Sequence, residues 1–347
     1  MHHSQLAPGF ATPEGTSRYA ARFPAHSMFY RTAQGLAVSS LGIGSYLGEL
    51  TTDADRAYEA AMLHAVENGI NFMDTSLNYR NQRSEINLAT ALRQASISQK
   101  TKREEIVVCT KAGFLVRGAI PSPPPDGVAG GMHSISPMFL RDQLNRSRLN
   151  LGLQTIDVFY LHNPETQLEF LTFAQFDIQL RAAFEALEEL CAEGAIRFYG
   201  TATWNGYRQA KGGLDLRRIE GIAREVAGDG HRFRFVQLPF NLGMTEALSL
   251  RDARGHNVLD IAAELGITVV ASASILQARL AGDLPPVIEE RLKGFATDAQ
   301  RAIQFARSAP GVSVALVGMG RVGHVVENLG VAAVPPASAE EFRALFH

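Results

Sequence analysis

The sequence predicts an α/β fold, a (β/α)8 TIM barrel in which eight parallel strands alternate with helices. Three observations carry this prediction. Short apolar segments recur along the 347 residues, stretches with helical periodicity separate them, and chemically active side chains follow several of the apolar segments. The expected strands are Ser40–Ile43, Ile70–Asp74, Ile106–Lys111, Ile156–His162, Arg197–Thr201, Arg234–Leu238, Thr268–Ala271 and Val312–Val317.

Amphipathic helices are expected between these strands. Three of them end next to a glycine, namely Gly69, Gly194 and Gly266, and glycine readily adopts the left-handed conformation that closes a helix. Strands that are separated by helices pair in parallel through βαβ units. The expected helices are Asp53–Asn68, Arg83–Ala95, Pro137–Leu151, Ile178–Glu193, Leu214–Val226, Val258–Leu265 and Val287–Ala306.

A glycine-rich segment near the C-terminus bears on the choice between a closed barrel and an open sheet. Residues 318–323 spell GxGxxG, the dinucleotide fingerprint of open sheets. That fingerprint opens a first βαβ unit, whereas only 24 residues follow Gly323 in this chain of 347. After the eighth strand of a barrel, the same glycines suit a loop whose backbone N–H groups bind phosphate. The position of the segment therefore favours the barrel.

Length and composition favour one barrel domain over residues 1–347, with 1–28 as an N-terminal extension. Hydrophobic residues make up 46% and charged residues 20%, which predicts a large core. A formal net charge of −2 predicts no binding of nucleic acid or of an anionic membrane. Two cysteines are too few for a disulfide framework or a zinc site, so no metal is expected. With no long apolar run, we expect a cytoplasmic protein, whose oligomeric state the sequence leaves open.

Two segments are longer than the usual loops of a barrel. Residues 113–137 are rich in proline and glycine, and residues 163–177 are unusually apolar for a connection. Both follow the carboxyl ends of expected strands, which is where the active site of a barrel lies. We therefore expect both segments to overhang the site.

Three of the expected strands end in an ionisable residue. Asp74, Lys111 and His162 each end an apolar run, and Tyr79 lies five residues after Asp74. Each has an ordinary structural explanation when taken alone, as a helix cap, a solvated cation or a structural hydrogen-bonding group. Together they would bring an acid, a cation, an imidazole and a phenol to one mouth of the barrel.

This set of groups suits the reduction of a carbonyl. A free tyrosine has a pKa near 10, and a neighbouring Lys111 ammonium is expected to lower that of Tyr79 while Asp74 holds the ammonium in place. His162 can orient a carbonyl oxygen through a hydrogen bond. None of these side chains can supply a hydride, so a nicotinamide cofactor is required.

The sequence resembles the aldo-keto reductase superfamily over residues 31–329. The resemblance implies that Asp74, Tyr79, Lys111 and His162 form the family's catalytic tetrad, with Tyr79 as general acid and base. The matching segments are Ser40–Gly44, Gly69–Thr75, Asn78–Tyr79, Ser84–Glu85, Thr110–Lys111, Asp157–His162 and Gln237–Asn241.

The resemblance also implies a nicotinamide site, in which several positions depart from the family's pattern. Ala202-Thr203 replaces a Ser-Asn pair, Gly318-Met319 replaces a Lys-Ser pair, and His324 replaces an arginine. Arg321 is the strong cation left for the 2′-phosphate, so NADP(H) is the expected cofactor and NAD(H) the alternative. The implied cofactor residues are Ser45, Tyr46, Asp74, Thr203, Gln237, Ser272, Ser274, Gly318, Met319, Gly320, Arg321, His324, Glu327 and Asn328.

Substrate recognition is expected to involve aromatic residues in the loops after three strands. Tyr46, Phe114 and Trp204 follow the first, third and fifth strands and would form pocket walls beside His162. The expected substrate is a small-molecule carbonyl or alcohol. Neither its identity nor the direction of the reaction follows from the sequence.

The resulting hypothesis is an NAD(P)H-dependent oxidoreductase that reduces an aldehyde or ketone, or oxidises the alcohol. Three alternatives stay open. The first is a redox-neutral epimerase or lyase that uses a tightly bound nicotinamide, and the second is a binding protein that senses nicotinamide. The third is an aldolase that forms a Schiff base on Lys111, which would leave Tyr79 without a role.

Overall fold

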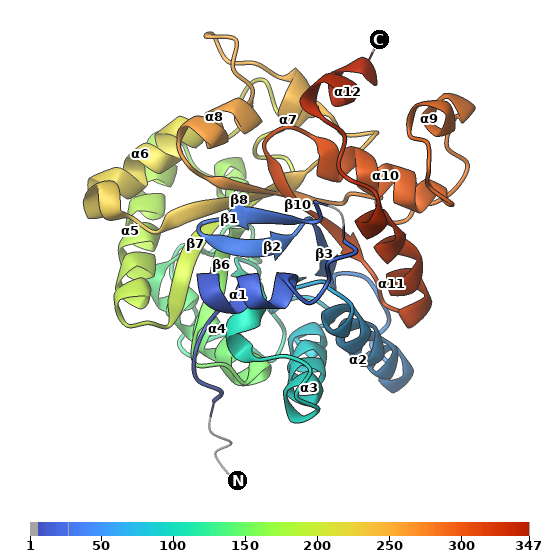
Figure 1. Cartoon of the computed structure of the whole chain (residues 1–347). Helices are drawn as coiled ribbons and strands as arrows, with labels where there is room; N and C mark the ends of the chain where they lie inside the picture. Colours follow the sequence, from blue (N-terminus) through green and yellow to red (C-terminus); the bar gives the residue numbers. More distant parts are fainter. Residues whose placement is uncertain (1–5, 27, 347) are drawn as a thin grey trace.

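The computed structural model describes residues 6–26 and 28–346. Eight parallel strands close into a barrel in the order β10-β3-β4-β5-β6-β7-β8-β9 (Figure 1), which confirms the predicted (β/α)8 fold. The barrel strands are β3 (Leu41–Gly44), β4 (Phe72–Asp74), β5 (Val107–Ala112), β6 (Ile156–His162), β7 (Ile196–Ala202), β8 (Phe233–Pro239), β9 (Thr268–Ser272) and β10 (Val312–Gly318).

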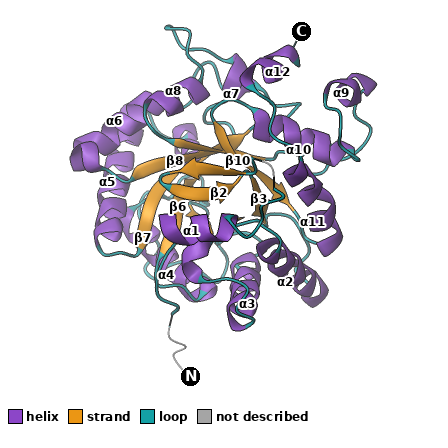
Figure 2. Ribbon diagram, viewed as in Figure 1, coloured by secondary structure: helices purple, strands orange, loops and turns teal. Residues whose placement is uncertain are grey.

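Helices surround the barrel on all sides (Figure 2), as expected for βαβ units. Gly69, Gly194 and Gly266 have positive φ angles of 105°, 73° and 64°, so each adopts the expected left-handed conformation after a helix. The α-helices around and beside the barrel are α2 (Thr52–Glu67), α3 (Arg83–Ile97), α4 (Pro137–Leu151), α5 (Phe173–Ala192), α6 (Leu216–Ala227), α7 (Glu246–Ser249), α8 (Val258–Glu264), α9 (Pro286–Arg291), α10 (Asp298–Ser308), α11 (Val322–Asn328) and α12 (Ala339–Ala344). Short 3-10 helices are η1 (Arg103–Glu105), η2 (Pro164–Glu169), η3 (Gly228–Gly230) and η4 (Leu329–Ala333).

Two predicted helix boundaries are wrong. The single helix expected over Val287–Ala306 is two helices, α9 and α10, because Gly294 adopts a φ of 87° and the Thr297 side chain caps α10. Helix α5 begins at Phe173 rather than at Ile178, because Thr172 and Gln175 form a capping box there. The segment after β6 is therefore shorter than the sequence suggested and contains η2.

The N-terminal segment covers the lower end of the barrel, where the strands begin. Helix α1 (Pro13–Ala20) and the hairpin of β1 (Tyr30–Ala33) and β2 (Leu36–Ser39) lie across this end (Figure 1). Leu36 and Val38 are buried among the apolar side chains that fill the barrel interior. Helix α1, which belongs to the expected extension, thus closes the lower end of the barrel. The hairpin of β1 and β2, which was not predicted, closes it together with α1.

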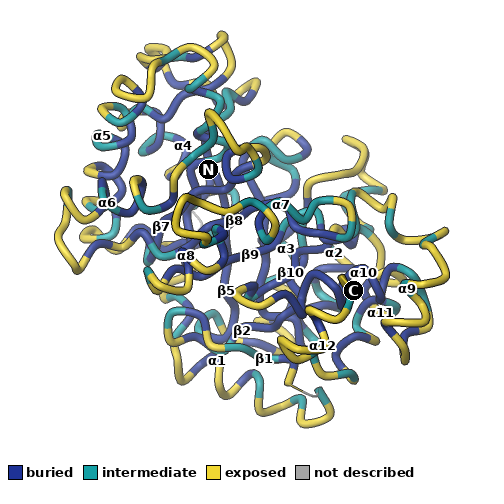
Figure 3. The backbone as a smooth tube through the Cα atoms, turned by 90° about the horizontal axis from the view of Figure 1, so that it is seen from above, coloured by how far each residue is buried: buried dark blue, intermediate teal, exposed yellow. Residues whose placement is uncertain are grey.

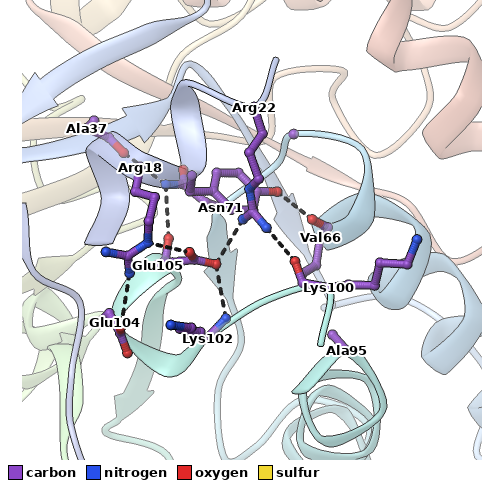
Figure 4. A network of polar contacts seen from close by, with 12 residues as sticks. Arg18, Arg22, Ala37, Val66, Asn71, Ala95, Lys100, Lys102, Glu104 and Glu105 are labelled. Atoms are coloured by element: carbon purple, nitrogen blue, oxygen red, sulfur yellow. Dashed lines mark hydrogen bonds and ion pairs between the residues drawn. The ribbon is translucent and has the colours of Figure 1, made fainter. Parts of the chain in front are cut away.

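A polar network fixes α1 to this end of the barrel (Figure 4). Arg18 and Arg22 pair with the carboxylate of Glu105 at 3.2 and 2.8 Å, although the Glu105 side chain is only 4% exposed. The Asn71 side chain donates to the Ala37 carbonyl at 2.8 Å and to the Glu105 carbonyl at 3.2 Å. Asn71 was expected inside a strand, but its bonds to the hairpin and to η1 accompany a later start of β4, at Phe72.

Burial follows the layers of the fold. The strands and the inner faces of the helices are buried, whereas the exposed residues lie on the outer faces of the helices and in the turns and connections (Figure 3). No helix among residues 6–26 and 28–346 combines the length and the apolar character needed to cross a membrane.

Candidate active site

A cavity of about 560 Å³ opens at the upper end of the barrel, where the strands end. The residues that line it come from the ends of strands and from the loops that follow them, as the fold predicts. The lining residues are Gly44, Ser45, Tyr46, Leu47, Asp74, Asn78, Tyr79, Phe114, His162, Asn163, Ala202, Thr203, Trp204, Gln237, Ser272, Ala273, Ser274, Ile275, Gln277, Ala278, Leu316, Val317 and Gly318.

Three of the four predicted catalytic side chains form a hydrogen-bonded chain on one wall. Lys111 Nζ lies 2.5 Å from Asp74 Oδ1, 2.9 Å from the Thr75 carbonyl and 3.3 Å from the Tyr79 hydroxyl. Gln237 donates to the other carboxylate oxygen, Asp74 Oδ2, at 2.9 Å. The ammonium therefore has its three protons directed at three oxygens, one of which is the phenol.

Burial and pairing act in opposite directions on the Asp74–Lys111 pair. Burial raises the pKa of Asp74, while Lys111 and Gln237 lower it in part. Burial lowers the pKa of Lys111, but Asp74 and Tyr79 raise it by more, so the net pKa lies above its ordinary value. Lys111 therefore stays an ammonium.

The pKa of Tyr79 differs from the expectation. Burial raises the pKa of the phenol, and the ammonium of Lys111 offsets this only in part. The sequence places a cation near Tyr79 and so predicts a lowered pKa, but it does not show how deeply the phenol is buried. Tyr79 consequently holds its proton through neutral pH, as a proton donor must.

His162, the fourth predicted residue, lies beside Tyr79 and not within the ion pair. Its ring makes edge contacts with Tyr79 and Phe114, at centroid distances of 5.7 and 5.1 Å. Its Nδ1 lies 3.2 Å from Ser76 Oγ, and its Nε2 makes no hydrogen bond to any described residue. Burial, with Lys111 and His133, places its pKa well below the ordinary value, so the ring is neutral at physiological pH.

The long loop after β5 is fixed to the site through His133, which the sequence analysis did not select. The Nε2 of His133 lies 2.7 Å from the His162 carbonyl, and its Nδ1 lies 2.8 Å from Gln167 Nε2. Phe114 packs edge-on against both histidine rings. The two long loops therefore meet at His162, although a histidine in an irregular loop carries no sequence pattern that would have identified this contact.

Glu165 was also missed, and it braces the loop that carries the predicted Trp204. Its Oε1 accepts hydrogen bonds from the backbone N–H groups of Trp204, Asn205 and Gly206 at 2.8, 3.0 and 3.1 Å. Burial raises the pKa of this carboxyl, and the backbone donors counteract that effect. Thr203, in the same loop, has a buried hydroxyl with no partner among the described residues.

The predicted cofactor residues divide into two groups. Ser45, Tyr46, Asp74, Thr203, Gln237, Ser272, Ser274 and Gly318 line the cavity. Gly320, Arg321, His324, Glu327 and Asn328 lie beyond its lining, in the segment after β10. Met319 was expected to contact cofactor, but its side chain is fully buried in the hydrophobic core, which leaves only its backbone for the loop.

The three predicted aromatic residues surround the mouth of the cavity. Tyr46 and Trp204 are 54% and 37% exposed, and Phe114 is half-buried. The Tyr46 ring lies 5.1 Å from that of Tyr79, centroid to centroid. A ligand that reaches Tyr79 would therefore pass apolar ring surfaces, with amides of Asn78 and Asn163 beside them.

Comparisons with known proteins agree with this architecture. A D-threo-aldose 1-dehydrogenase from Pseudomonas sp is 33% identical over 186 residues, covering 48% of this chain, which thus spans about half the length (51%) of that relative. The uncharacterized oxidoreductase YqkF of Bacillus subtilis (strain 168) is 23% identical over 333 residues, or 89% of this chain and 92% of the relative. An aldo/keto reductase from Klebsiella pneumoniae, solved with NADP and acetate, superposes with a TM-score of 0.66 and 21% identity. That structural match covers 92% of this chain and 94% of the other, and it shows the shared fold.

A family model covers the part of the chain that carries the tetrad. The model of the Aldo/keto reductase family matches residues 40–283, more than half of the chain. The match includes Asp74, Tyr79, Lys111 and His162. The chain therefore belongs to the aldo/keto reductase family.

Proposed function

We propose that the protein is an NADP(H)-dependent oxidoreductase that interconverts a small carbonyl compound and its alcohol, with Tyr79 as general acid and base. One observation carries the proposal. The Tyr79 hydroxyl lies at the end of a buried Asp74–Lys111 pair and faces a cavity beside His162. A phenol next to a fixed ammonium can give up its proton and take it back, because the cation stabilises the phenolate.

The residues around the cavity fit a nicotinamide cofactor. The orphaned buried hydroxyl of Thr203 lines the cavity next to Gln237, and both side chains can bind a carboxamide. Beyond the cavity lies the glycine-rich segment after β10, where the Arg321 side chain makes no ion pair with a described residue and is free for a phosphate. A bound nicotinamide supplies or accepts the hydride. The relatives solved with NADP or NADPH support NADP(H) as the cofactor.

The chain's own groups then control the proton. In carbonyl reduction, Tyr79 gives its hydroxyl proton to the substrate oxygen, and Lys111 stabilises the phenolate that remains. Asp74 and the Thr75 carbonyl hold Lys111 in place through two hydrogen bonds. His162 bonds to the substrate oxygen through Nε2 and orients it toward Tyr79.

Sugars are the substrate class that the site supports best. The mouth combines aromatic rings, which pack against the apolar face of a sugar, with the amides of Asn78 and Asn163, which can bind hydroxyls. The aldose named for the 33% identical relative supports the same class. We therefore expect aldoses to be better substrates than aldehydes without hydroxyl groups.

The test is a screen of aldoses and simple aldehydes with NADPH, and of the corresponding alcohols and lactols with NADP⁺, following absorbance of the reduced cofactor. Turnover that is lost in the Tyr79→Phe variant would support the proposal. Turnover that survives in this variant would contradict it. The redox-neutral alternative predicts conversion of substrate without net change in absorbance, and the binding-protein alternative predicts cofactor binding without conversion.

A further inference from the structure

One loop in the wall of the cavity is held in place by side chains that lie behind that wall. Residues 46–50 follow β3, and two of them line the cavity. The hydrogen bonds that this loop makes to described residues all come from two side chains. The Tyr58 hydroxyl donates to the Leu47 carbonyl. Arg80 donates to the Glu49 carbonyl twice, from Nε at 3.1 Å and from Nη2 at 2.8 Å.

Arg80 directly follows Tyr79 in the chain, and its side chain is only 1% exposed. Besides the loop carbonyl, its guanidinium binds Asp55 Oδ1 in α2 at 2.8 Å and Asn87 Oδ1 in α3 at 2.7 Å. It also lies over the ring of Tyr58, 4.8 Å from the centroid. Because the guanidinium is a rigid planar donor, contacts in these several directions fix both its position and its orientation. Arg80 therefore joins the loop to two helices and to the turn that carries Tyr79.

The backbone after Tyr79 adopts an unusual conformation that places this side chain. Arg80, Asn81 and Gln82 have φ angles of 47°, 51° and 74°, a left-handed conformation that residues other than glycine seldom adopt. Such backbone persists where surrounding contacts enforce it, and it is common at functional sites. Tyr79 lines the cavity and Arg80 does not, so the turn directs the guanidinium behind the wall.

Gly48 shows how closely the loop packs against the two side chains. It lies between the two bound carbonyls and has a φ of 125°. A Cβ atom at this position would lie 2.9 Å from Tyr58 Cε2 and 3.3 Å from Arg80 Nε. Glycine therefore leaves the room that the contact needs.

We propose that Arg80 is a positioning residue that fixes the loop 46–50, and with it the ring of Tyr46, beside Tyr79. The two rings lie 5.1 Å apart between centroids, and Tyr46 is 54% exposed, so its own burial does not hold it there. The effect on turnover rests on the proposed function, in which Tyr79 moves the proton. The placement of the loop, in contrast, is a property of the chain alone.

Arg80→Gly and Arg80→Asn test the guanidinium separately from the backbone. Glycine and asparagine both tolerate the left-handed conformation, and neither can reach the Glu49 carbonyl. Because small misplacements of reacting groups lower rates strongly, kcat per folded enzyme should fall about tenfold in both variants. The KM for the carbonyl substrate should rise as well, since the Tyr46 wall is no longer fixed. An unchanged KM in both variants, or a loss in Arg80→Gly alone, would overturn the proposal.

Arg83→Met is the matched control, because Arg83 binds the other carboxylate oxygen of Asp55 from a side chain that is 41% exposed. It makes no hydrogen bond to a described residue of the loop, so KM and kcat should stay those of the wild type. Gly48→Ala disturbs the same contact from the loop side and should reproduce the raised KM. Wild-type kinetics in Gly48→Ala would contradict the proposal, and urea unfolding verifies that each variant is folded.

Fluorine NMR of the full chain, labelled with 3-fluorotyrosine, tests the placement of the loop without any turnover. The Tyr46→Phe variant identifies the signal of Tyr46 among those of the eight tyrosines. We expect this signal to shift or broaden in Arg80→Gly and in Arg80→Asn, and to stay unchanged in Arg83→Met. A Tyr46 signal that is the same in all four proteins would show that Arg80 does not hold the loop.

These outcomes are separate from those of the proposed function. If no carbonyl is reduced but the Tyr46 signal depends on Arg80, the placement of the loop stands and the assigned activity fails. If Tyr79→Phe abolishes turnover but neither the Tyr46 signal nor KM depends on Arg80, the activity stands and the positioning role fails.

Discussion

Each end of the barrel contains a buried carboxylate paired with one or two cationic side chains. The two ends differ in whether the polar groups around the carboxylate all have hydrogen-bond partners within the chain. At the lower end, Glu105 binds Arg18 and Arg22 and accepts the backbone N–H of Lys102 at 3.0 Å (Figure 4). At the upper end, Asp74 binds Lys111 and Gln237. Both carboxylates are nearly inaccessible, so burial alone does not distinguish a structural pair from a catalytic one.

The difference lies in the neighbours of each pair. The carboxylate oxygens of Glu105 are bonded to arginines that reach solvent and to the backbone, so its network is complete within the chain. The Lys111 ammonium instead contacts the Tyr79 hydroxyl at 3.3 Å, in a cavity where the Thr203 hydroxyl has no described partner. A buried pair next to unpartnered polar atoms in a cavity indicates chemistry, whereas a completed pair indicates a joint between elements.

Removing the proposed proton donor should have the largest effect and should distinguish the two ends most clearly. Tyr79→Phe keeps the ring beside Tyr46 and His162 but removes the hydroxyl, so turnover should fall at least about a hundredfold. Unfolding by denaturant and cofactor binding by fluorescence titration should stay close to those of the wild type. If the variant instead unfolds more easily and turns over normally, the upper pair is structural and the comparison is wrong.

Replacing Lys111 should have the next largest effect and should change the dependence on pH. The raised pKa of Tyr79 predicts that carbonyl reduction stays constant through neutral pH and falls as the pH rises through that pKa, because the phenol then loses its proton. Lys111→Met removes the cation that lowers this pKa, so the fall should move to higher pH, with a rate about tenfold lower.

The pH profile of kcat/KM measures both effects of the Lys111 substitution. The neutral state of His162, whose pKa is lowered by burial, predicts no loss of rate between pH 6.5 and 8 in either protein. A shift to lower pH in Lys111→Met, or a borohydride-trapped adduct on Lys111 of the wild type, would contradict the electrostatic role.

The fold could be predicted because the barrel strands are buried on both faces and therefore read as continuous apolar runs. The hairpin at the lower end could not. Its strands span only four residues each, and its turn, Gln34-Gly35, lacks the asparagine or aspartate that usually marks such a turn. Its burial depends on contact with the open end of the barrel, and a local sequence pattern does not contain that contact.

The position of the tetrad could be predicted, and its electrostatics could not. Asp74 and His162 end their strands and Lys111 is the last residue but one of β5, so their convergence follows from the barrel. The direction in which the pKa of Tyr79 shifts depends on how deeply the phenol is buried. That burial is set by loops distant in sequence. Ser76, Glu165 and His133 likewise become recognisable only through their contacts in space.

A substitution of Arg321 tests whether the upper end of the barrel also binds the 2′-phosphate of the cofactor. Its side chain is exposed and unpaired among the described residues, unlike Arg18 and Arg22 below. If it binds the 2′-phosphate, Arg321→Ala should weaken NADPH binding about tenfold, the value of one charge-assisted hydrogen bond, and leave NADH binding unchanged. Titration of both cofactors against both proteins measures this. Equal affinities for the two cofactors in the wild type, unaltered in the variant, would exclude a role for Arg321.

The smallest effect is expected at the lower pair, where Glu105→Gln should destabilise the protein by about 1 kcal/mol without changing kcat. The amide keeps the shape and part of the hydrogen bonding but loses the attraction to Arg18 and Arg22, whose side chains are 48% and 38% exposed and therefore screened by water. Glu104→Gln is the matched control, because Glu104 pairs with Arg18 at 2.9 Å from a position that is itself 40% exposed, and it should cost less than about 0.5 kcal/mol. Urea unfolding measures the stabilities, and turnover at saturating cofactor measures the activity. If Glu105→Gln lowered kcat while stability stayed the same, the lower pair would act on the site through the barrel, and the separation of a structural end from a catalytic end would fail.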